Sequence, residues 1–261
     1  MSEEQELART ISAYLDGSCT LAQTVATVAE PIERAYAAGD GAAVEGLLWD
    51  LWYATIEAAQ RTPHASPRQQ ALVDVVAGLK ARAEPPEPAD AARGGWVFAE
   101  RGLWGAPKLL GAAMRETWNA RPDERGGAGM GGEGMGAGEW ANVNAFAARL
   151  SAGGVCDFVL YAIWSVRDAL EEERAEGALV PGAGVWFLYA GRAIWESAEE
   201  YGRAGRGGVV WTGKSGFCKE RWGLWKKRFG EVVRDGGVGE EARAMARQAV
   251  EAMERVEAGE A

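Results

Sequence analysis

The chain has few cysteines and almost no histidine, and both shortages limit the chemistry that it can perform. Its 261 residues contain three cysteines, Cys19, Cys156 and Cys218, and a single histidine, His64. An odd number of widely spaced cysteines argues against a disulfide framework and is typical of a reducing compartment. A structural zinc site needs four ligands, and one histidine with scattered cysteines does not supply them. The sequence therefore predicts no metal site.

The sequence also lacks the segments that carry a chain into or across a membrane. Residues 1–6 are acidic where a secretory signal peptide would be basic. The longest apolar stretch, residues 179–195, contains Pro181, three glycines and Arg192, so it is too short and too interrupted to span a bilayer. We expect a protein of the cytoplasm, or of the nucleus, with no membrane span.

An excess of negative charge makes nucleic acid an unexpected partner. The 38 acidic residues outnumber the 28 basic ones, which gives a formal net charge of −10. A phosphate backbone is repelled by such a balance unless a local basic patch overrides it. We therefore expect the partner to be a protein or a small hydrophobic molecule.

Signals for β-strands are scarce, whereas signals for helices recur. Only residues 208–211 look extended. Asp40 precedes apolar residues spaced three and four apart over 44–59, and Ser66, Pro67 and Gln69 form a capping-box pattern. A further helix is expected from about Asp90 to Asn119. The sequence predicts an all-α array of roughly nine to eleven helices, with no significant sheet.

Tryptophan and glycine are both abundant, and each has a structural consequence. Twelve tryptophans and 48% apolar residues predict a thick, aromatic-rich core. The segments 155–166 and 180–195 are apolar almost all round, which places them at its centre. Eight of the thirteen residues over 126–138 are glycine, so residues 121–139 are expected to be a disordered insertion within one domain spanning 1–261. The G-x-G-x-x-G match in this tract lacks the preceding strand that a dinucleotide site needs, so no cofactor is predicted.

Polar residues accompany aromatic ones in three segments, and they are the candidate site residues. They are Arg115, Glu116, Trp118 and Asn119 before the glycine tract, Trp140, Asn142, Asn144 and Arg149 after it, and Tyr161, Arg167, Trp186 and Tyr189 in the apolar helices. A charge inside such a helix needs a partner, because desolvating an unpaired ion costs several kcal/mol. We favour a buried network that fixes the helix crossings. The alternative is the polar floor of an aromatic pocket walled by Trp118, Trp140, Trp186 and Tyr189.

His64 lies in a short connection between two predicted helices, and any mechanism that needs an imidazole must use it. Its neighbours Thr62, Pro63 and Ser66 suit a helix-to-helix turn. We favour a structural role for His64 over a catalytic one.

Six short motifs give the chain a family resemblance. They are Trp49-x-x-Trp52, Thr62-Pro63-His64, Arg115-Glu116-x-Trp118-Asn119, Trp140-x-Asn142-x-Asn144-Ala145-Phe146-Ala147-Ala148-Arg149-Leu150, Arg167-Asp168-Ala169-Leu170-Glu171 and Arg221-Trp222-x-x-Trp225-Lys226. Together they resemble a family of ascomycete fungal proteins known as domain of unknown function 3632, over roughly residues 45 to 255. The resemblance implies a fungal origin and a helical intracellular fold, and it assigns no catalytic residue.

Two functional hypotheses remain open. The first is a helical binding or scaffold protein, which fits the missing cofactor motifs and the lone histidine. The second is a cofactor-free enzyme, such as a cyclase or isomerase, that acts on a hydrophobic small molecule in secondary metabolism. In that enzyme Glu116 would be the acid or base, and Arg115 or Arg149 would stabilise an anion.

Overall fold

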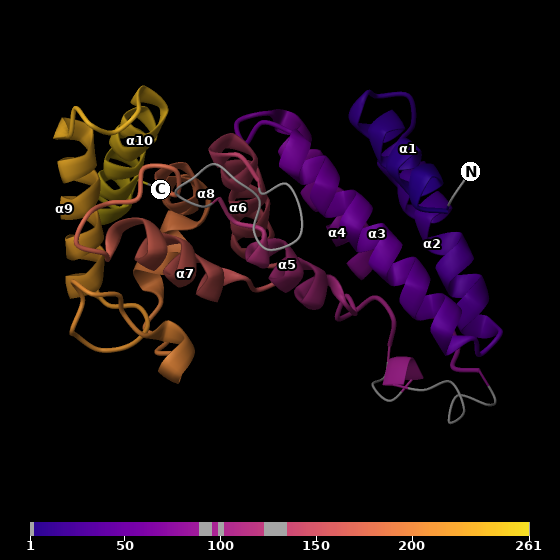
Figure 1. Ribbon diagram of the computed structural model, residues 1–261. Helices are drawn as coiled ribbons and strands as arrows, with labels where there is room; N and C mark the ends of the chain where they lie inside the picture. The colour runs from indigo at the N-terminus through magenta and orange to yellow at the C-terminus, as the bar shows by residue number, and fades with distance from the viewer. Residues whose placement is uncertain (1–2, 89–95, 99–101, 123–134, 261) are drawn as a thin grey trace. The chain divides into compact units, whose positions relative to one another are not determined.

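Helices account for all the regular secondary structure that is described. The structure is a computed structural model (Figure 1), and it describes residues 3–88, 96–98, 102–122 and 135–260. Over these residues the chain forms ten α-helices and two short 3₁₀-helices, η2 and η3, and no strand. The predicted all-α class and helix number are therefore confirmed. Residues 208–211, which look extended in the sequence, contain turns.

The chain divides into two compact units. Unit 1 comprises Met1–Thr62 and Ser66–Asn119, and unit 2 comprises Pro63–Ala65 and Ala120–Ala261. The elements of unit 1 are α1 (Glu3–Leu15), α2 (Leu21–Ala37), α3 (Gly41–Arg61), α4 (Pro67–Lys80), η2 (Trp96–Phe98) and α5 (Leu110–Asn119). The elements of unit 2 are α6 (Ala137–Ala152), α7 (Val159–Leu170), α8 (Val180–Glu196), η3 (Gly202–Gly205), α9 (Lys219–Arg234) and α10 (Glu240–Glu257). A single domain spanning the whole chain stays a prediction.

Side-chain caps begin two helices of unit 1 where the sequence predicts them. The Asp40 carboxylate accepts a hydrogen bond from the Ala43 N–H (3.0 Å), and the Ser66 hydroxyl accepts one from the Arg68 N–H (3.2 Å). Gln69, in contrast, points inward. Its Nε2 donates to carbonyl oxygens at the end of α3, so this side chain joins α4 to α3.

The predicted helix from Asp90 to Asn119 is wrong in its middle part. Residues 89–95 and 99–101 lie outside the described residues, and the chain from 102 to 109 forms turns before α5 begins at Leu110. The Glu84 carboxylate accepts backbone N–H bonds from Leu103, Trp104 and Gly105 at 2.5, 3.0 and 2.6 Å. These amides are satisfied by a carboxylate rather than by helix carbonyls, so the segment can turn instead of coiling.

Helix α8 is the centre of unit 2. It packs against α6, α7 and α10, and α10 packs in turn against α9. Phe187 on α8 meets Trp222, Trp225 and Phe229 of α9 edge-on, with ring centroids 5.3, 6.0 and 5.4 Å apart. The first half of the second apolar segment lies inside the fold as predicted, because the residues of α8 from Val180 to Phe187 are all buried. The first segment is only partly enclosed, since Asp157 is exposed.

The sequence predicts a disordered loop over residues 121–139, and most of that segment falls outside the described residues, which omit 123–134. The last part of the segment is helical. Helix α6 begins at Ala137, and the Glu139 carboxylate accepts a hydrogen bond from the Gly136 N–H (2.9 Å), which stabilises the first turn. Among the helices that the structure describes, none has the length and apolar character that crossing a bilayer requires.

The close packing of α8 on α6 depends on Gly182 and gives a first prediction. A Cβ atom at Gly182 would lie 2.5 Å from Trp140 Nε1, whereas one at Gly223 of α9 would meet nothing within 4 Å. We expect Gly182→Ala to lower the free energy of unfolding by about 1–3 kcal/mol through overpacking. Gly223→Ala should raise it by up to about 1 kcal/mol. Urea unfolding checks this, and a change of the same sign in both variants would contradict the packing argument.

Candidate functional site

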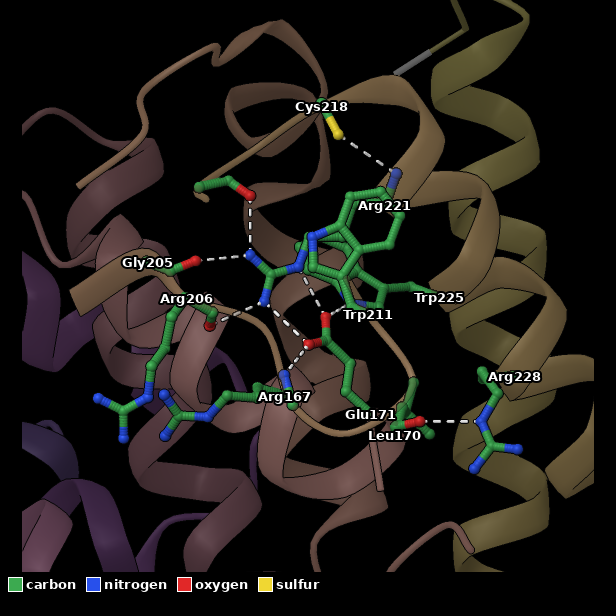
Figure 2. Close-up of polar contacts among 12 residues, drawn as sticks. Arg167, Leu170, Glu171, Gly205, Arg206, Trp211, Cys218, Arg221, Trp225 and Arg228 are labelled. Atoms are coloured by element: carbon green, nitrogen blue, oxygen red, sulfur yellow. Dashed lines mark hydrogen bonds and ion pairs between the residues drawn. The ribbon is translucent and has the colours of Figure 1, made fainter. Parts of the chain in front are cut away.

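A fully buried ion pair lies at the centre of the polar contacts of unit 2 (Figure 2). Glu171 follows the last residue of α7, and Arg221 lies in the first turn of α9. Both side chains are 0% exposed. Their contact is bidentate: Arg221 Nε donates to Glu171 Oε1 (2.7 Å) and Nη2 donates to Oε2 (2.9 Å). This fork geometry is the strongest that a guanidinium and a carboxylate can form.

The remaining hydrogen-bonding positions of the ion pair are also occupied. Glu171 accepts from Trp225 Nε1 (2.6 Å) and from the Gly208 N–H (2.7 Å). Arg221 donates to the carbonyl oxygens of Gly205, Gly216 and Arg206 at 2.8, 2.9 and 3.2 Å. All five N–H groups of the guanidinium are therefore used. An ion pair without a spare donor or acceptor cannot bind a ligand, so its role is to hold the surrounding backbone segment in place.

The backbone segment held in this way comprises residues 202–214, and we name it the 202–214 loop. Three of the backbone groups that contact the ion pair, at Gly205, Arg206 and Gly208, belong to it. The glycines are required by close approach, since a Cβ at Gly208 would lie 2.8 Å from Glu171 Cβ. Gly216, just after the loop, has a φ of +79°. The glycine-rich sequence therefore encodes an ordered loop.

The outer face of the 202–214 loop is apolar and basic. Val209 is 59% exposed and Val210 38%, and they are two of the three large hydrophobic residues that are exposed in the described part of the chain. Arg203 and Arg206 are exposed, and their guanidinium groups have no partner among the described residues. Lys214 lies 3.4 Å from the Glu200 carboxylate. The loop thus presents two valines beside two free positive charges.

Asn144 is the second buried polar centre, and it joins three helices. Its Oδ1 accepts hydrogen bonds from Ser165 Oγ of α7 (2.6 Å) and Trp186 Nε1 of α8 (2.7 Å). Its Nδ2 donates to the Trp140 carbonyl oxygen in α6 (2.8 Å). Three of the predicted site residues, Asn144, Trp140 and Trp186, therefore come together. Their side chains are buried, and the hydrogen bonds fix how the helices cross.

A third group of polar residues surrounds the only histidine, and we name it the His64 cluster. It consists of His64, Asn142, Arg149 and Tyr189, all of which belong to unit 2. The His64 N–H donates to Asn142 Oδ1 (2.7 Å), and its carbonyl oxygen accepts from Arg149 Nη2 (3.3 Å) and the Tyr189 hydroxyl (3.1 Å). His64 Nδ1 lies 3.0 Å from the same hydroxyl. These contacts are compatible with a structural role for His64, which stays a prediction.

The remaining candidate residues are distributed over both units. Arg115, Glu116 and Asn119 are exposed on α5 in unit 1, where Asn119 Nδ2 donates to Glu116 Oε2 (3.3 Å), and Trp118 is buried beside them. In unit 2, Tyr161 is buried against Trp164 (4.7 Å between ring centroids).

Arg167 lies four residues before Glu171, yet the two side chains have different ionic partners. Arg167 Nε donates to Asp168 Oδ1 (2.8 Å), whereas Glu171 pairs with Arg221.

An open cavity of about 590 Å³ lies in unit 2, away from the predicted residues. It is lined by the α7–α8 connection and by the start of α10, with Arg174, Glu176, Asp235 and Glu241 supplying its charges. None of the predicted site residues lines this cavity. Within the described residues, no three side chains of His, Cys, Asp or Glu gather in a way that could hold a metal ion.

These observations define an all-helical protein whose aromatic core encloses buried polar centres. The chain belongs to the family described as protein of unknown function (DUF3632), whose model matches residues 52–229. The match includes the Glu171–Arg221 pair, the 202–214 loop and the His64 cluster. No curated protein and no solved structure matches the chain. The expected family is thereby confirmed, and the expected fungal origin stays a prediction.

The buried ion pair gives a second prediction. Glu171→Gln would place an amide NH₂ against donors and leave the Arg221 charge buried without a counter-ion. We expect this change to lower the free energy of unfolding by about 3–5 kcal/mol. Glu196→Gln breaks the exposed pair with Arg192 (2.9 Å) and should cost less than about 1 kcal/mol. Denaturant unfolding checks the prediction. Equal losses of unfolding free energy in the two variants would contradict a larger stabilising role for the buried pair than for the exposed one.

His64 gives a third prediction, on the dependence of stability on pH. Burial, followed by the nearby Arg149 charge, lowers the pKa of His64 below its usual value, while Glu241 opposes the shift. Below about pH 6.5 the unfolded chain binds a proton that the folded chain binds less readily. The difference in proton binding at His64 therefore lowers the free energy of unfolding as the pH falls from about 6.5 toward the lower pKa of His64 in the folded state.

Unfolding measured between pH 8 and pH 5 checks the prediction. His64→Gln should lose less stability over this range than the wild type, although its stability at pH 8 can be lower because the Tyr189 contact is gone. Parallel stability–pH curves for the two proteins would contradict it.

Proposed function

We propose that this chain is a helical protein-binding module and that the 202–214 loop is its docking surface. The observation that carries the proposal is an exposed pair, Val209 and Val210, on a loop that a fully buried ion pair holds in place. Contiguous exposed apolar side chains rimmed by polar residues are typical of interaction sites, whereas singly scattered ones are not. A loop that is already ordered also loses little conformational entropy on binding.

The charge of the loop indicates the chemistry of the partner. Residues 202–214 contain three basic residues and no acidic one, in a chain whose net charge is −10. Arg203 and Arg206 have no partner among the described residues, so a bound carboxylate would not need to displace an existing one. We therefore infer that the partner offers acidic residues beside an apolar contact. Such complementarity accelerates and orients association.

A lipid surface is less suited to this loop than a protein is. Segments that bind anionic membranes carry about four to eight clustered basic residues or a second anchoring signal. Here the ion pair between Lys214 and Glu200 leaves two free arginines, and the exposed apolar area is that of two valines. These contributions are too small to hold the chain on a bilayer but match the centre and rim of a small protein interface.

The enzyme hypothesis receives no comparable support. Glu116, its acid or base, is exposed on α5, and the described cavity has none of the predicted residues in its lining. The three free cysteines in the described residues support placing the binding module in a reducing compartment, the cytoplasm or the nucleus.

Site-specific photocrosslinking in extract from the natural host gives the fourth prediction. A photoreactive amino acid at Val209 should form a discrete adduct with one protein, whereas the same group at Glu251, exposed on α10, should not. With that partner purified, Arg203→Glu combined with Arg206→Glu should weaken binding at least about tenfold, more so at low salt. Arg255→Glu, an exposed arginine on α10, is the matched control and should leave binding unchanged.

Two results would reject the docking surface. One is the same set of adducts from positions 209 and 251, and the other is an adduct whose affinity survives the double charge reversal. Adducts between two copies of the chain would make the loop a self-association site instead. Flotation of the chain with anionic vesicles would favour a lipid partner over a protein.

A further inference from the structure

We propose that Arg149 and His64 form a binding site for an oxyanion, the carboxylate or phosphate group of a small ligand. The site lies in the His64 cluster, which shares no residue with the 202–214 loop. The inference therefore goes beyond the proposed docking function and stands or fails independently of it.

The first reason is that the Arg149 guanidinium lacks an anionic partner. It lies over the Tyr189 ring, with Cζ 3.8 Å from the ring centroid, and Nη2 makes one long hydrogen bond to the His64 carbonyl oxygen (3.3 Å). Its Nε is buried without a hydrogen-bond partner. Among the described residues, no carboxylate forms an ion pair with Arg149.

The second reason is the contrast with Arg221, the fully buried arginine of unit 2. Arg221 uses all five of its N–H groups and faces a carboxylate, as a desolvated guanidinium requires. Arg149 is partly buried and uses one. Stacking on Tyr189 stabilises the face of the guanidinium, but it uses no N–H group along its edge. A planar or tetrahedral oxyanion matches that edge, because the guanidinium fork binds carboxylates and phosphates with two parallel hydrogen bonds.

The third reason is the position of the His64 imidazole beside this guanidinium. Nδ1 faces the Tyr189 hydroxyl (3.0 Å), which leaves Nε2 as the ring nitrogen without a partner in the described residues. The charged groups that act on the ring are Arg149 from α6 and Glu241 from α10. A bound oxyanion would offset the Arg149 charge and would make protonation of the imidazole easier. Glu241 is exposed, so solvent and salt screen its repulsion of an anion.

The single histidine makes the fifth prediction direct to test by NMR, because one imidazole signal reports on the site. We expect sodium sulfate or sodium acetate to shift the His64 signal with a saturating curve and to raise its pKa, whereas sodium chloride at the same ionic strength does not. Sulfate is the probe for a phosphate-type ligand, because it does not titrate near neutral pH. Acetate is the probe for a carboxylate. The probe with the stronger response identifies the ligand class.

Variants of arginine separate a built site from general salt effects. Arg149→Gln should weaken binding of the responding anion at least about tenfold, and Arg149→Lys should weaken it less, because it keeps the charge without the fork. Arg192→Gln, on the exposed part of α8, should bind like the wild type. If Arg149→Gln does not fold, the wild type and the lysine variant still decide the question.

Three outcomes would overturn the proposal: no saturation with sulfate or acetate, an equal response to chloride, or unchanged affinity in the folded Arg149→Gln variant. Any of these outcomes would limit the role of Arg149 to its hydrogen bond with the His64 carbonyl oxygen. The docking function of the 202–214 loop would be unaffected, since it is tested by crosslinking at Val209.

Discussion

The bidentate contact between Glu171 and Arg221 is the interaction on which the surrounding structure of unit 2 depends. Removing a carboxylate and a guanidinium from water costs several kcal/mol each, and their mutual attraction alone need not offset that cost. Here the loop amide and carbonyl groups and the Trp225 indole complete the coordination. The charges and the loop therefore stabilise each other, because neither the ions nor the loop backbone would be satisfied alone.

The helices could be predicted from sequence, because periodic apolar residues report a local property. The N-cap residues Asp40 and Ser66 and the buried segment of α8 were found in this way. The predicted helix that is absent around Trp104 has a physical explanation. Around Trp104, the Glu84 carboxylate about twenty residues away captures the backbone amides. A contact between a side chain and distant backbone leaves no periodic signal, so the pattern could not show it.

The candidate sites could be predicted only in part, for a related reason. The sequence predicts that Asn142, Arg149 and Tyr189 have polar partners, because polar groups in an apolar helix need them, and the structure groups these residues around His64. Their partner could not be inferred, since His64 and Tyr189 are 125 residues apart. Likewise Arg221 is 50 residues from Glu171, whereas Arg167, a helical turn away, has a different partner. Helical spacing identifies which residues share a face of a helix, but it does not reveal which residues of another element contact that face.

The path of the 202–214 loop is specified mainly by side chains outside the loop, together with Trp211 within it, whose Nε1 donates to the Lys214 carbonyl oxygen (2.9 Å). Arg221 binds loop carbonyl oxygens, and Glu171 binds a loop amide. The exposed side chains of Arg203, Val209 and Val210 make no contact with the described residues that maintains the shape of the loop, whereas glycine is required where the backbone approaches closely. Related proteins could exchange those side chains freely while keeping one frame, so that recognition can diverge without redesign of the fold. The backbone path of the loop and the side chains that it exposes are therefore determined by different residues.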